Sequence, residues 1–320
     1  YLPPCQSACP TGIPVQKRWE LIRQGKIDEA VDLALQYTPF PATVCGYLCP
    51  NLCMQNCTRR RVSLPAIDIR VLGKASLSAK TPVRLPETGK KIAVIGGGAA
   101  GLSVAWQLWM KGHEAVIIEG RKKLGGKITD SIPKSRIPVD VVEHEINRLA
   151  KCIRKMHLGK PLTKERFLSL KQENDYMVIA TGAVKPRKLN VPGMEKALTA
   201  LEFLQQSKLD CVTVGQKVVI IGAGNVGCDA ATEAFRLGAQ SVTLIDIQPP
   251  ASFGIEREHA EAAGAKFLWP RFTKAVTDEG VELTEGELLP AETVIVAVGD
   301  MPDLSFLPDE IRTEKNFITV

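Results

Sequence analysis

The sequence predicts an α/β protein with two Rossmann-like dinucleotide-binding domains, preceded by a small all-helical domain. Three observations predict this class. A strand–glycine loop–helix pattern occurs twice, each copy is followed by a strand that ends in an acid, and cysteines crowd the beginning of the chain. At 320 residues the chain is long enough for two or three domains. The sequence contains no run of about 18 unbroken apolar residues, so no membrane span is predicted.

Residues 1–75 are expected to form the helical domain. Apolar residues recur with helical spacing over residues 15–24 and again over residues 27–36, with Gly25 between the two runs. A proline-containing stretch directly afterwards ends the second helix. Residues 76–90 contain Pro, Ser and Lys, and they are predicted to be a linker.

The first nucleotide-binding pattern follows this linker. An apolar strand at residues 91–95 leads into G-x-G-x-x-G and then into a helix. The first glycine permits a tight turn, the second lets the backbone approach a pyrophosphate, and the third lets helix and strand pack closely. The helix N-terminus adds free N–H groups. The loop residues expected to bind are Gly96, Gly98, Ala99, Ala100 and Gly101. Roughly 20 residues on, a second strand ends at Glu119, where an acid accepts from a ribose hydroxyl.

The second copy repeats every part of the first. A strand at residues 217–221 leads into a loop whose binding residues are expected to be Gly222, Gly224, Asn225, Val226 and Gly227. The following strand ends at Asp246. One copy alone would be a weak signal. Two copies predict two bound dinucleotides, and two dinucleotides suggest that electrons pass between them. Buried strands at residues 176–183 and 293–299 close the two domains, and a helix is expected over residues 197–206.

Cysteine spacing is the second strong signal. Six of the nine cysteines lie at the start of the chain: Cys5, Cys9, Cys45, Cys49, Cys53 and Cys57. Because they precede nucleotide-binding domains, they are interpreted as metal ligands of an intracellular enzyme rather than disulfides. C-x3-C-P followed by C-x3-C-P-x2-C-x3-C suits iron–sulfur clusters, since thiolates on short turns can reach several irons of one cube. A structural zinc site is the alternative, but it usually uses paired C-x2-C elements, and this stretch has none.

The net charge of the chain is +6, and residues 59–91 are rich in Lys and Arg. A nucleic-acid site would interleave aromatic residues, which are scarce here, so no nucleic acid is expected as a partner. We interpret the segment as a solvated linker or as a surface that docks an acidic protein.

The chain resembles the small (beta) subunit of NADPH-dependent glutamate synthase. The same family includes the N-terminal half of dihydropyrimidine dehydrogenase and the flavin subunits of electron-bifurcating transhydrogenases. The marks are Cys5-Gln6-Ser7-Ala8-Cys9-Pro10, Cys45-Gly46-Tyr47-Leu48-Cys49-Pro50, and Ala180-Thr181-Gly182 between the two glycine loops. The resemblance covers essentially the whole chain. It implies a disulfide-reductase-like layout, with two [4Fe–4S] clusters in the helical domain, an FAD domain at residues 91–190 plus 300–320, and an NAD(P)H domain at residues 191–299.

The resemblance also implies roles for particular residues. The first glycine loop would hold FAD and the second the nicotinamide nucleotide, with Glu119 on the FAD ribose. Gly125, Gly126, Thr181 and Gly182 match positions near the flavin in this family. The family closes its FAD domain with a later strand and a Gly-Asp pair, which we expect beyond Val320.

The family's cluster motif begins C-x2-C-x4-C-x3-C-P, and Cys5 and Cys9 match its last two positions. The earlier pair is expected upstream of Tyr1. By the family pattern, Cys9 joins Cys49 and Cys53 on one cluster, and Cys5 and Cys57 join the earlier pair on the other. Asp68 is the candidate for a non-cysteine ligand of the first cluster, the alternative being an acid on a helix surface. Cys45 is either a further ligand or a small residue packed beside the cluster.

The nicotinamide loop departs from glutamate synthase. Small subunits of that enzyme tend to place arginines after the second strand, where they pair with the 2′-phosphate of NADPH. Here Asp246 is followed by Ile247 and Gln248. A carboxylate accepts from a free 2′-hydroxyl and repels a phosphate, so NAD(H) is expected. NADP(H) is the alternative, because Arg257 could turn back towards this position.

These features predict an NAD(P)H-dependent oxidoreductase subunit in a cytoplasmic hetero-oligomeric complex, passing electrons to or from a redox partner protein through FAD and the clusters. Since the cofactors carry the chemistry, no catalytic acid or base is expected. The alternatives are a glutamate synthase small subunit that uses NADPH and a non-catalytic electron-relay subunit. A disulfide reductase would need a cysteine pair beside the flavin, but Cys152, Cys211 and Cys228 stand alone.

Overall fold

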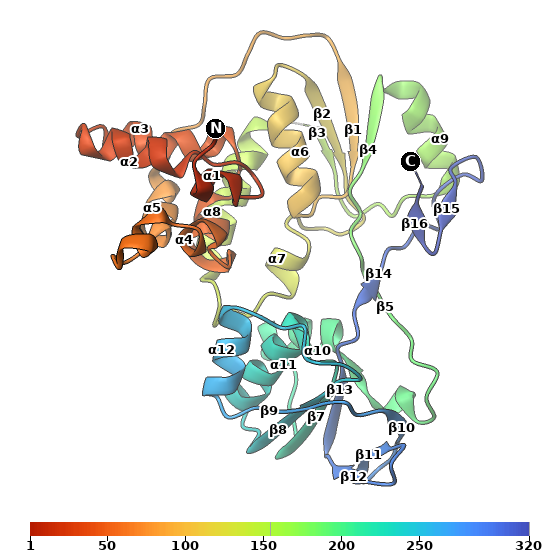
Figure 1. Cartoon of the computed structure of the whole chain (residues 1–320). Helices are drawn as coiled ribbons and strands as arrows, with labels where there is room; N and C mark the ends of the chain where they lie inside the picture. The colour runs from red at the N-terminus through yellow and green to blue at the C-terminus, as the bar shows by residue number, and fades with distance from the viewer. Residues whose placement is uncertain (154, 320) are drawn as a thin grey trace. The chain divides into compact units, whose positions relative to one another are not determined.

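The computed structural model describes residues 1–153 and 155–319 and divides the chain into two compact units, each built on a parallel sheet. Unit 1 contains Tyr1–Thr129, Lys134–Gly182 and the segment from Leu304 onwards, and unit 2 contains Asp130–Pro133 and Ala183–Asp303 (Figure 1). The predicted α/β class is confirmed. No helix in the described part of the chain is long and apolar enough to cross a bilayer.

Unit 1 begins with a group of short helices. They are α1 (Pro4–Ser7), α2 (Val15–Arg23), α3 (Ile27–Asp32), η1 (Leu33–Gln36), η2 (Ala42–Leu48), α4 (Leu52–Gln55), η3 (Thr58–Val62), α5 (Ile69–Ala75) and η4 (Ser76–Ser78). The helix expected over residues 27–36 is α-helical only as far as Asp32 and then tightens to a 3-10 helix, a common way for a helix to end. η2 is a π-helix, and it carries Cys45.

The sheet of unit 1 has the order β3-β2-β1-β4, with every pair parallel. Its strands are β1 (Lys91–Ile95), β2 (Glu114–Ile118), β3 (Lys155–His157) and β4 (Tyr176–Ile179). Its further elements are α6 (Ala99–Met110), α7 (Lys127–Asp130), α8 (Val139–Cys152), α9 (Lys164–Glu173), β15 (Thr313–Glu314) and β16 (Phe317–Ile318). The strand expected over residues 176–183 is shorter and only partly buried, because β4 pairs with β1 alone.

Both faces of this sheet are covered. Val94 and Ile117 pack in the core shared with α6 and the short helices, whereas Val116 and Ile118 pack against Leu170 of α9. Two covered faces explain why β1 and β2 are apolar along nearly their whole length instead of alternating.

Unit 2 repeats this plan with a five-stranded parallel sheet of order β6-β13-β7-β8-β9. Its strands are β6 (Leu198–Thr199), β7 (Lys217–Ile221), β8 (Ser241–Ile245), β9 (Lys266–Leu268) and β13 (Thr293–Val296). Antiparallel strands β10 (Thr273–Val276), β11 (Gly280–Leu283) and β12 (Leu288–Pro290) form a second sheet, and β5 (Lys185–Pro186) pairs with β14 (Asp300–Met301). The helices are η5 (Met194–Lys196), α10 (Ala200–Lys208), α11 (Asn225–Arg236) and α12 (Ile255–Ala262).

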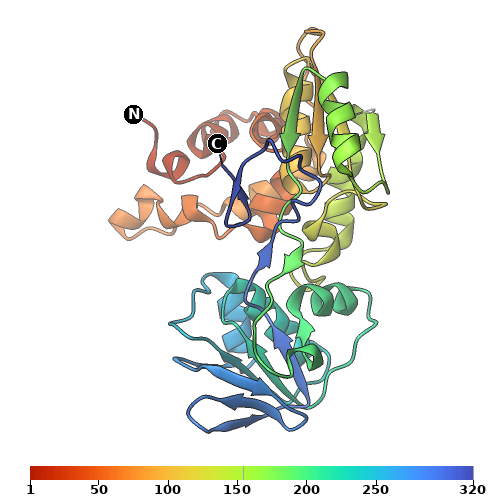
Figure 2. The same ribbon diagram turned by 90° about the vertical axis from the view of Figure 1, so that its right-hand side faces the viewer.

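Each face of the unit 2 parallel sheet has its own cover. Helices cover one face and the antiparallel sheet lies on the other (Figure 2). Val218 and Ile220 pack against the helices, and Val219 and Ile221 pack towards the antiparallel sheet. The helix expected from residue 197 begins only at Ala200. Thr199 explains the later start, since it caps α10 in a reciprocal capping box with Glu202.

A buried ion pair ties the short helices of unit 1 to its sheet domain. The wholly buried Glu145 of α8 accepts hydrogen bonds from the backbone N–H groups of Ala42 (2.9 Å) and Thr43 (2.8 Å), which begin η2. Arg148 pairs with Glu145 at 3.0 Å and donates to the carbonyl oxygens of Pro39 and Ser76. One carboxylate thus holds a segment that lies about a hundred residues earlier in the chain.

We expect Glu145→Ala to lower the free energy of unfolding of unit 1 by about 3–5 kcal/mol, because the change leaves a buried guanidinium unpaired. Urea unfolding followed by circular dichroism measures the loss. Glu143→Ala is the matched control, since Glu143 is an exposed residue of the same helix. Equal unfolding midpoints for the two variants would contradict the stabilising role assigned to Glu145.

Candidate functional site

The two glycine loops have the same backbone geometry. Gly96 and Gly222 both have φ +110°, a conformation that favours glycine. Gly98 and Gly224 both precede their helices in extended conformation, at φ −78° and −81°. The matched loops, strands and twelve-residue helices show that the two sequence patterns fold into one repeated structure.

Each glycine has its own steric reason. A Cβ on Gly96 would overlap the carbonyl oxygen of Ala180, and a Cβ on Gly101 would overlap the carbonyl oxygen of Gly96. The second glycine differs, because a Cβ on Gly224 would meet no atom within 4 Å and one on Gly98 only the Cα of Gly126 at 4.0 Å. The space beside this glycine is therefore open, as the approach of a pyrophosphate requires.

The two acids lie beside their loops in matching positions. Glu119 accepts from the backbone N–H of Gly97 at 2.6 Å, and Asp246 accepts from that of Ala223 at 2.8 Å. The other carboxylate oxygen of each acid accepts from the backbone N–H two residues later. This donor is Arg121 for Glu119 and Gln248 for Asp246. Each carboxylate thus holds the middle of its loop while lying where a ribose hydroxyl would bind. Such charge-assisted bonds contribute about 1.5–3 kcal/mol.

The other predicted flavin-site residues gather around the first loop. The N–H of Gly125 donates to the carbonyl of Gly97 at 2.8 Å, and Gly126 lies against Gly98. Thr181 and Gly182 follow β4 at the carboxyl edge of the sheet, and Gly182 has φ +67°. Ala99 and Ala100 lie exposed in the first turn of α6. In unit 2, Asn225 and the exposed Val226 open α11 in the equivalent place.

The cysteines of the short helices come together from separate segments. All nine cysteines of the chain are free thiols. Cys9, Cys49 and Cys53 lie close enough to Cys45 to influence its titration, while Cys5, Cys53 and Cys57 line one cavity of about 300 Å³. Among the described residues, no three Cys, His, Asp or Glu side chains are placed to hold a single metal ion. The ligands of a cube bind separate irons, so they need not converge on one point.

Several observations fit a bound cluster. Cys49 Sγ accepts from the N–H of Asn51 at 3.3 Å, and Cys9 Sγ lies 3.4 Å from the hydroxyl of Thr11. Burial raises the pKa of Cys45 to about 12, an effect that Arg18 opposes, and burial together with neighbouring thiols raises the pKa of Cys53 to about 11. These thiols would release their protons on binding a metal.

Two buried donors in α2 also lack a partner among the described residues. They are Nη1 of Arg18 and the indole N–H of Trp19. Trp19 lines the cavity that contains Cys5 and Cys57. Donors without acceptors are costly in a protein interior, and bound inorganic sulfide would offer acceptors here.

Asp68 caps α5 in the structure. One of its oxygens accepts from the backbone N–H of Arg70, and the carboxylate pairs with the Arg70 guanidinium at 2.8–2.9 Å. The hydrogen bond from the Arg70 side chain lowers the pKa of Asp68. Both oxygens are engaged in this arrangement, and a ligand role for Asp68 stays a prediction.

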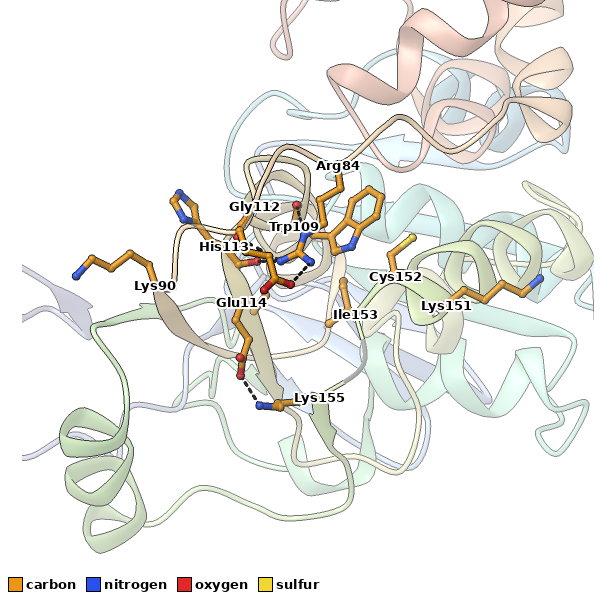
Figure 3. A pocket seen from close by; sticks show the side chains of 13 residues that line it. Arg84, Lys90, Trp109, Gly112, His113, Glu114, Lys151, Cys152, Ile153 and Lys155 are labelled. Carbon is orange, nitrogen blue, oxygen red and sulfur yellow. Dashed lines mark hydrogen bonds and ion pairs between the residues drawn. The ribbon is translucent and has the colours of Figure 1, made fainter.

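A separate cavity of about 540 Å³ lies where β1 and β2 begin (Figure 3). This edge of the unit 1 sheet is opposite to the carboxyl edge that carries the glycine loop. Several of its charged side chains are paired, as Glu114 is with Lys155 at 2.7 Å and Arg84 with Glu87 at 3.0 Å. Nucleotides bind at the carboxyl ends of parallel strands, so this cavity is not the nucleotide site.

Charged residues in buried positions were not predicted from the sequence, and two of them matter most for unit 1. Arg18 lies on the buried face of α2 with Val15 and Leu21, and Glu145 lies on the buried face of α8 with Val141. Both occupy positions that the helical period assigns to apolar residues. A charge within an apolar stripe was therefore the signal that could have found them.

Comparison with known proteins identifies the domains. Residues 90–320 match the family described as pyridine nucleotide-disulphide oxidoreductase. Residues 1–81 match the family described as dihydropyrimidine dehydrogenase domain II, 4Fe-4S cluster. Together the two matches support binding of a flavin, a nicotinamide nucleotide and a 4Fe–4S cluster. The disulfide-reductase-like layout and the helical iron–sulfur domain predicted from the sequence are confirmed.

Named relatives agree with these matches. The chain is 29% identical to an NADPH-Fe(3+) oxidoreductase subunit beta of Geobacter sulfurreducens, covering 97% of this chain and 53% of the relative. It is 28% identical to the glutamate synthase [NADPH] small chain of Azospirillum brasilense, covering 88% of this chain and 64% of the relative. The chain thus spans about half the length of the first relative. The resemblance to the glutamate synthase small subunit is confirmed.

Solved structures share the fold. Thioredoxin reductase of T. acidophilum superposes with a TM-score of 0.56 at 20% identity, covering 71% of this chain and 83% of that one. At this identity the likeness describes the fold alone.

The loop geometry leads to a paired test in unit 2. Gly224→Ala should leave thermal unfolding unchanged, because the new methyl group enters open space, yet weaken nicotinamide binding more than about tenfold, or 1.4 kcal/mol. Gly227→Ala should instead destabilise unit 2 by about 1–3 kcal/mol, since its methyl group would overlap the Gly222 carbonyl. Calorimetry gives the affinity and the melting temperature. Undiminished binding by the first variant would show that this loop is not the pyrophosphate cradle.

Proposed function

Because the chain belongs to the pyridine nucleotide-disulphide oxidoreductase family, we propose that it is the nicotinamide-oxidising subunit of a larger redox complex. In this proposal it passes electrons from NADH through FAD and [4Fe–4S] clusters to a partner protein. The repeated glycine loop with its acid, found in both units, is the observation that carries the proposal. A single loop would support only nucleotide binding.

When bound, the nicotinamide supplies a hydride, the flavin accepts it, and the clusters accept single electrons. The chain's own residues do the holding. Gly96, Gly98, Ala99, Ala100 and Gly101, with Glu119, would bind the pyrophosphate and ribose of FAD, and Gly125, Gly126, Thr181 and Gly182 would line the flavin. Gly222, Gly224, Asn225, Val226 and Gly227, with Asp246, would bind NADH in the same manner.

The surroundings of Asp246 favour NADH over NADPH. A 2′-phosphate would meet the Asp246 carboxylate, and the following residues Ile247 and Gln248 carry no positive charge. Arg257, a cation that could have compensated, pairs with Glu261 at 2.7 Å and lies over the Phe267 ring at 4.6 Å. Relatives whose names specify NADPH make this the point at which our proposal departs from them.

The partner is proposed to be an acidic redox protein that docks beside the clusters. We name the exposed residues Arg59, Arg60, Arg61, Val62 and Leu64 the arginine patch; it begins two residues after Cys57. No acidic residue occurs between Asp32 and Asp68. Neither Arg60 nor Arg61 forms an ion pair within the described part of the chain. Unpaired cations beside exposed apolar side chains suit an acidic protein surface.

The proposed function is tested by anaerobic reconstitution with iron, sulfide and FAD, followed by rapid mixing with NADH or NADPH. We expect a yellow-brown protein that bleaches with NADH more than about tenfold faster than with NADPH, and a preference that falls about tenfold in Asp246→Ala. Glu279→Ala, an exposed acid elsewhere in unit 2, should leave the preference unchanged. A protein that retains neither FAD nor iron contradicts the function, and faster bleaching by NADPH contradicts the choice of nucleotide.

The arginine patch leads to a salt-dependent prediction. In Arg60→Glu/Arg61→Glu, NADH-dependent reduction of an acidic [2Fe–2S] ferredoxin should slow about tenfold at low ionic strength, because electrostatic steering is lost. The difference should shrink near 0.15 M salt, where the Debye length is about 8 Å. Lys217→Glu/Lys266→Glu, a double charge reversal on exposed residues of unit 2, is the control. Equal slowing in both double variants would indicate an effect of net charge instead of docking at the patch.

A further inference from the structure

We propose that Arg18 is a positioning residue of the iron–sulfur site, whose buried positive charge raises the reduction potential of the cluster that Cys9, Cys49 and Cys53 would hold. The inference rests on the proposed function, since it requires a cluster in the helical segment. It concerns a residue outside the cysteine motifs.

The guanidinium of Arg18 is wholly enclosed by protein. Arg18 is 0% exposed and is one of the largest fully buried side chains of the chain. Nε donates to the carbonyl oxygen of Ala30 at 2.7 Å, and Nη2 donates to the Leu72 carbonyl at 3.3 Å and to the Ser76 hydroxyl at 3.1 Å. All three acceptors are neutral, so they orient the guanidinium without balancing its charge.

The third nitrogen, Nη1, has no partner among the described residues. No carboxylate in the part of the chain that the structure describes is hydrogen-bonded to the group, although a buried cation without a counter-ion is costly. The carbonyl oxygen of Leu72 that Arg18 contacts directly precedes Gly73, and Gly73 packs against the backbone and Cβ of Cys45. Arg18 is thus held at the helix that packs on the Cys45 turn, four residues before Cys49. Burial lowers the pKa of Arg18 only to about 10, so the side chain stays charged at neutral pH.

A cluster bound by thiolates is the counter-ion that this arrangement lacks. A [4Fe–4S] cube with cysteine ligands is an anion, and reduction adds one electron and no proton, so the negative charge grows by one. A fixed cation nearby stabilises the reduced form more than the oxidised form. Net charge and hydrogen bonds to sulfur are among the factors that set cluster potentials. The proposed electron source is the flavin, reduced in turn by NADH.

The test is a redox titration of the reconstituted protein followed by electron paramagnetic resonance. Neutral substitution in Arg18→Gln or Arg18→Met should lower the equilibrium constant for reduction of one cluster at least tenfold, which is 59 mV for one electron. Arg18→Lys keeps the charge and should stay within about threefold of the wild type. Ser76→Ala removes one acceptor of Arg18 without changing any charge, and it should not shift the potential.

Iron and sulfide content decide how each outcome is read. Full iron with an unchanged potential in the neutral variants overturns the role of Arg18 and leaves the proposed function intact. Loss of iron in the neutral variants with retention in Arg18→Lys supports charge compensation. Loss in Arg18→Lys as well overturns it, because the guanidinium would then serve folding alone. A wild-type protein without iron contradicts the proposed function itself.

Discussion

The arrangement of unit 1 depends on one buried carboxylate. Glu145 meets the first N–H groups of η2 through two hydrogen bonds and is itself balanced by Arg148, which also holds the carbonyl oxygens of Pro39 and Ser76. η2 carries Cys45 and ends just before Cys49. Burial raises the pKa of Glu145, but the two N–H donors and the adjacent guanidinium favour its ionised form. We call residues 42–57, which carry the last four of the six clustered cysteines, the cysteine segment. One helix of the sheet domain, α8, therefore fixes where this segment begins.

Close backbone packing completes this arrangement. A Cβ on Gly73 of α5 would lie within 3 Å of backbone atoms of Cys45 and Gly46, so α5 and η2 approach as closely as two glycines allow. Trp106 of α6 donates to the carbonyl of Leu35 at 2.7 Å from the same core. The cysteine segment is thus held by the sheet domain through hydrogen bonds and by α5 through shape. These contacts explain why it forms one compact unit with the sheet of unit 1.

The sequence was most informative where neighbouring residues determine the structure. The glycine loops could be predicted because turn, helix start and following acid all lie within a short stretch, and each glycine has a local steric reason. The contacts of Glu145 could not be predicted, because they join residues more than a hundred positions apart. The length of β4 was also beyond local reasoning. An apolar run indicates a strand, but how much of it pairs depends on which neighbours the sheet supplies.

The positive charge around the cysteines meets one physical requirement, which is to balance a buried anionic site. Burial disfavours thiolates, as the raised pKa values of Cys45 and Cys53 indicate, so an anionic site there needs positive charge nearby. The stretch between Asp32 and Asp68 contains three arginines and no acid, and Asp68 is already paired with Arg70. Arg18 brings a further cation into the interior, while Arg60 and Arg61 remain at the surface. In our two proposals these positive charges have separate roles. The inner charge would stabilise an anionic cluster, and the outer charges would attract an acidic partner to the same place.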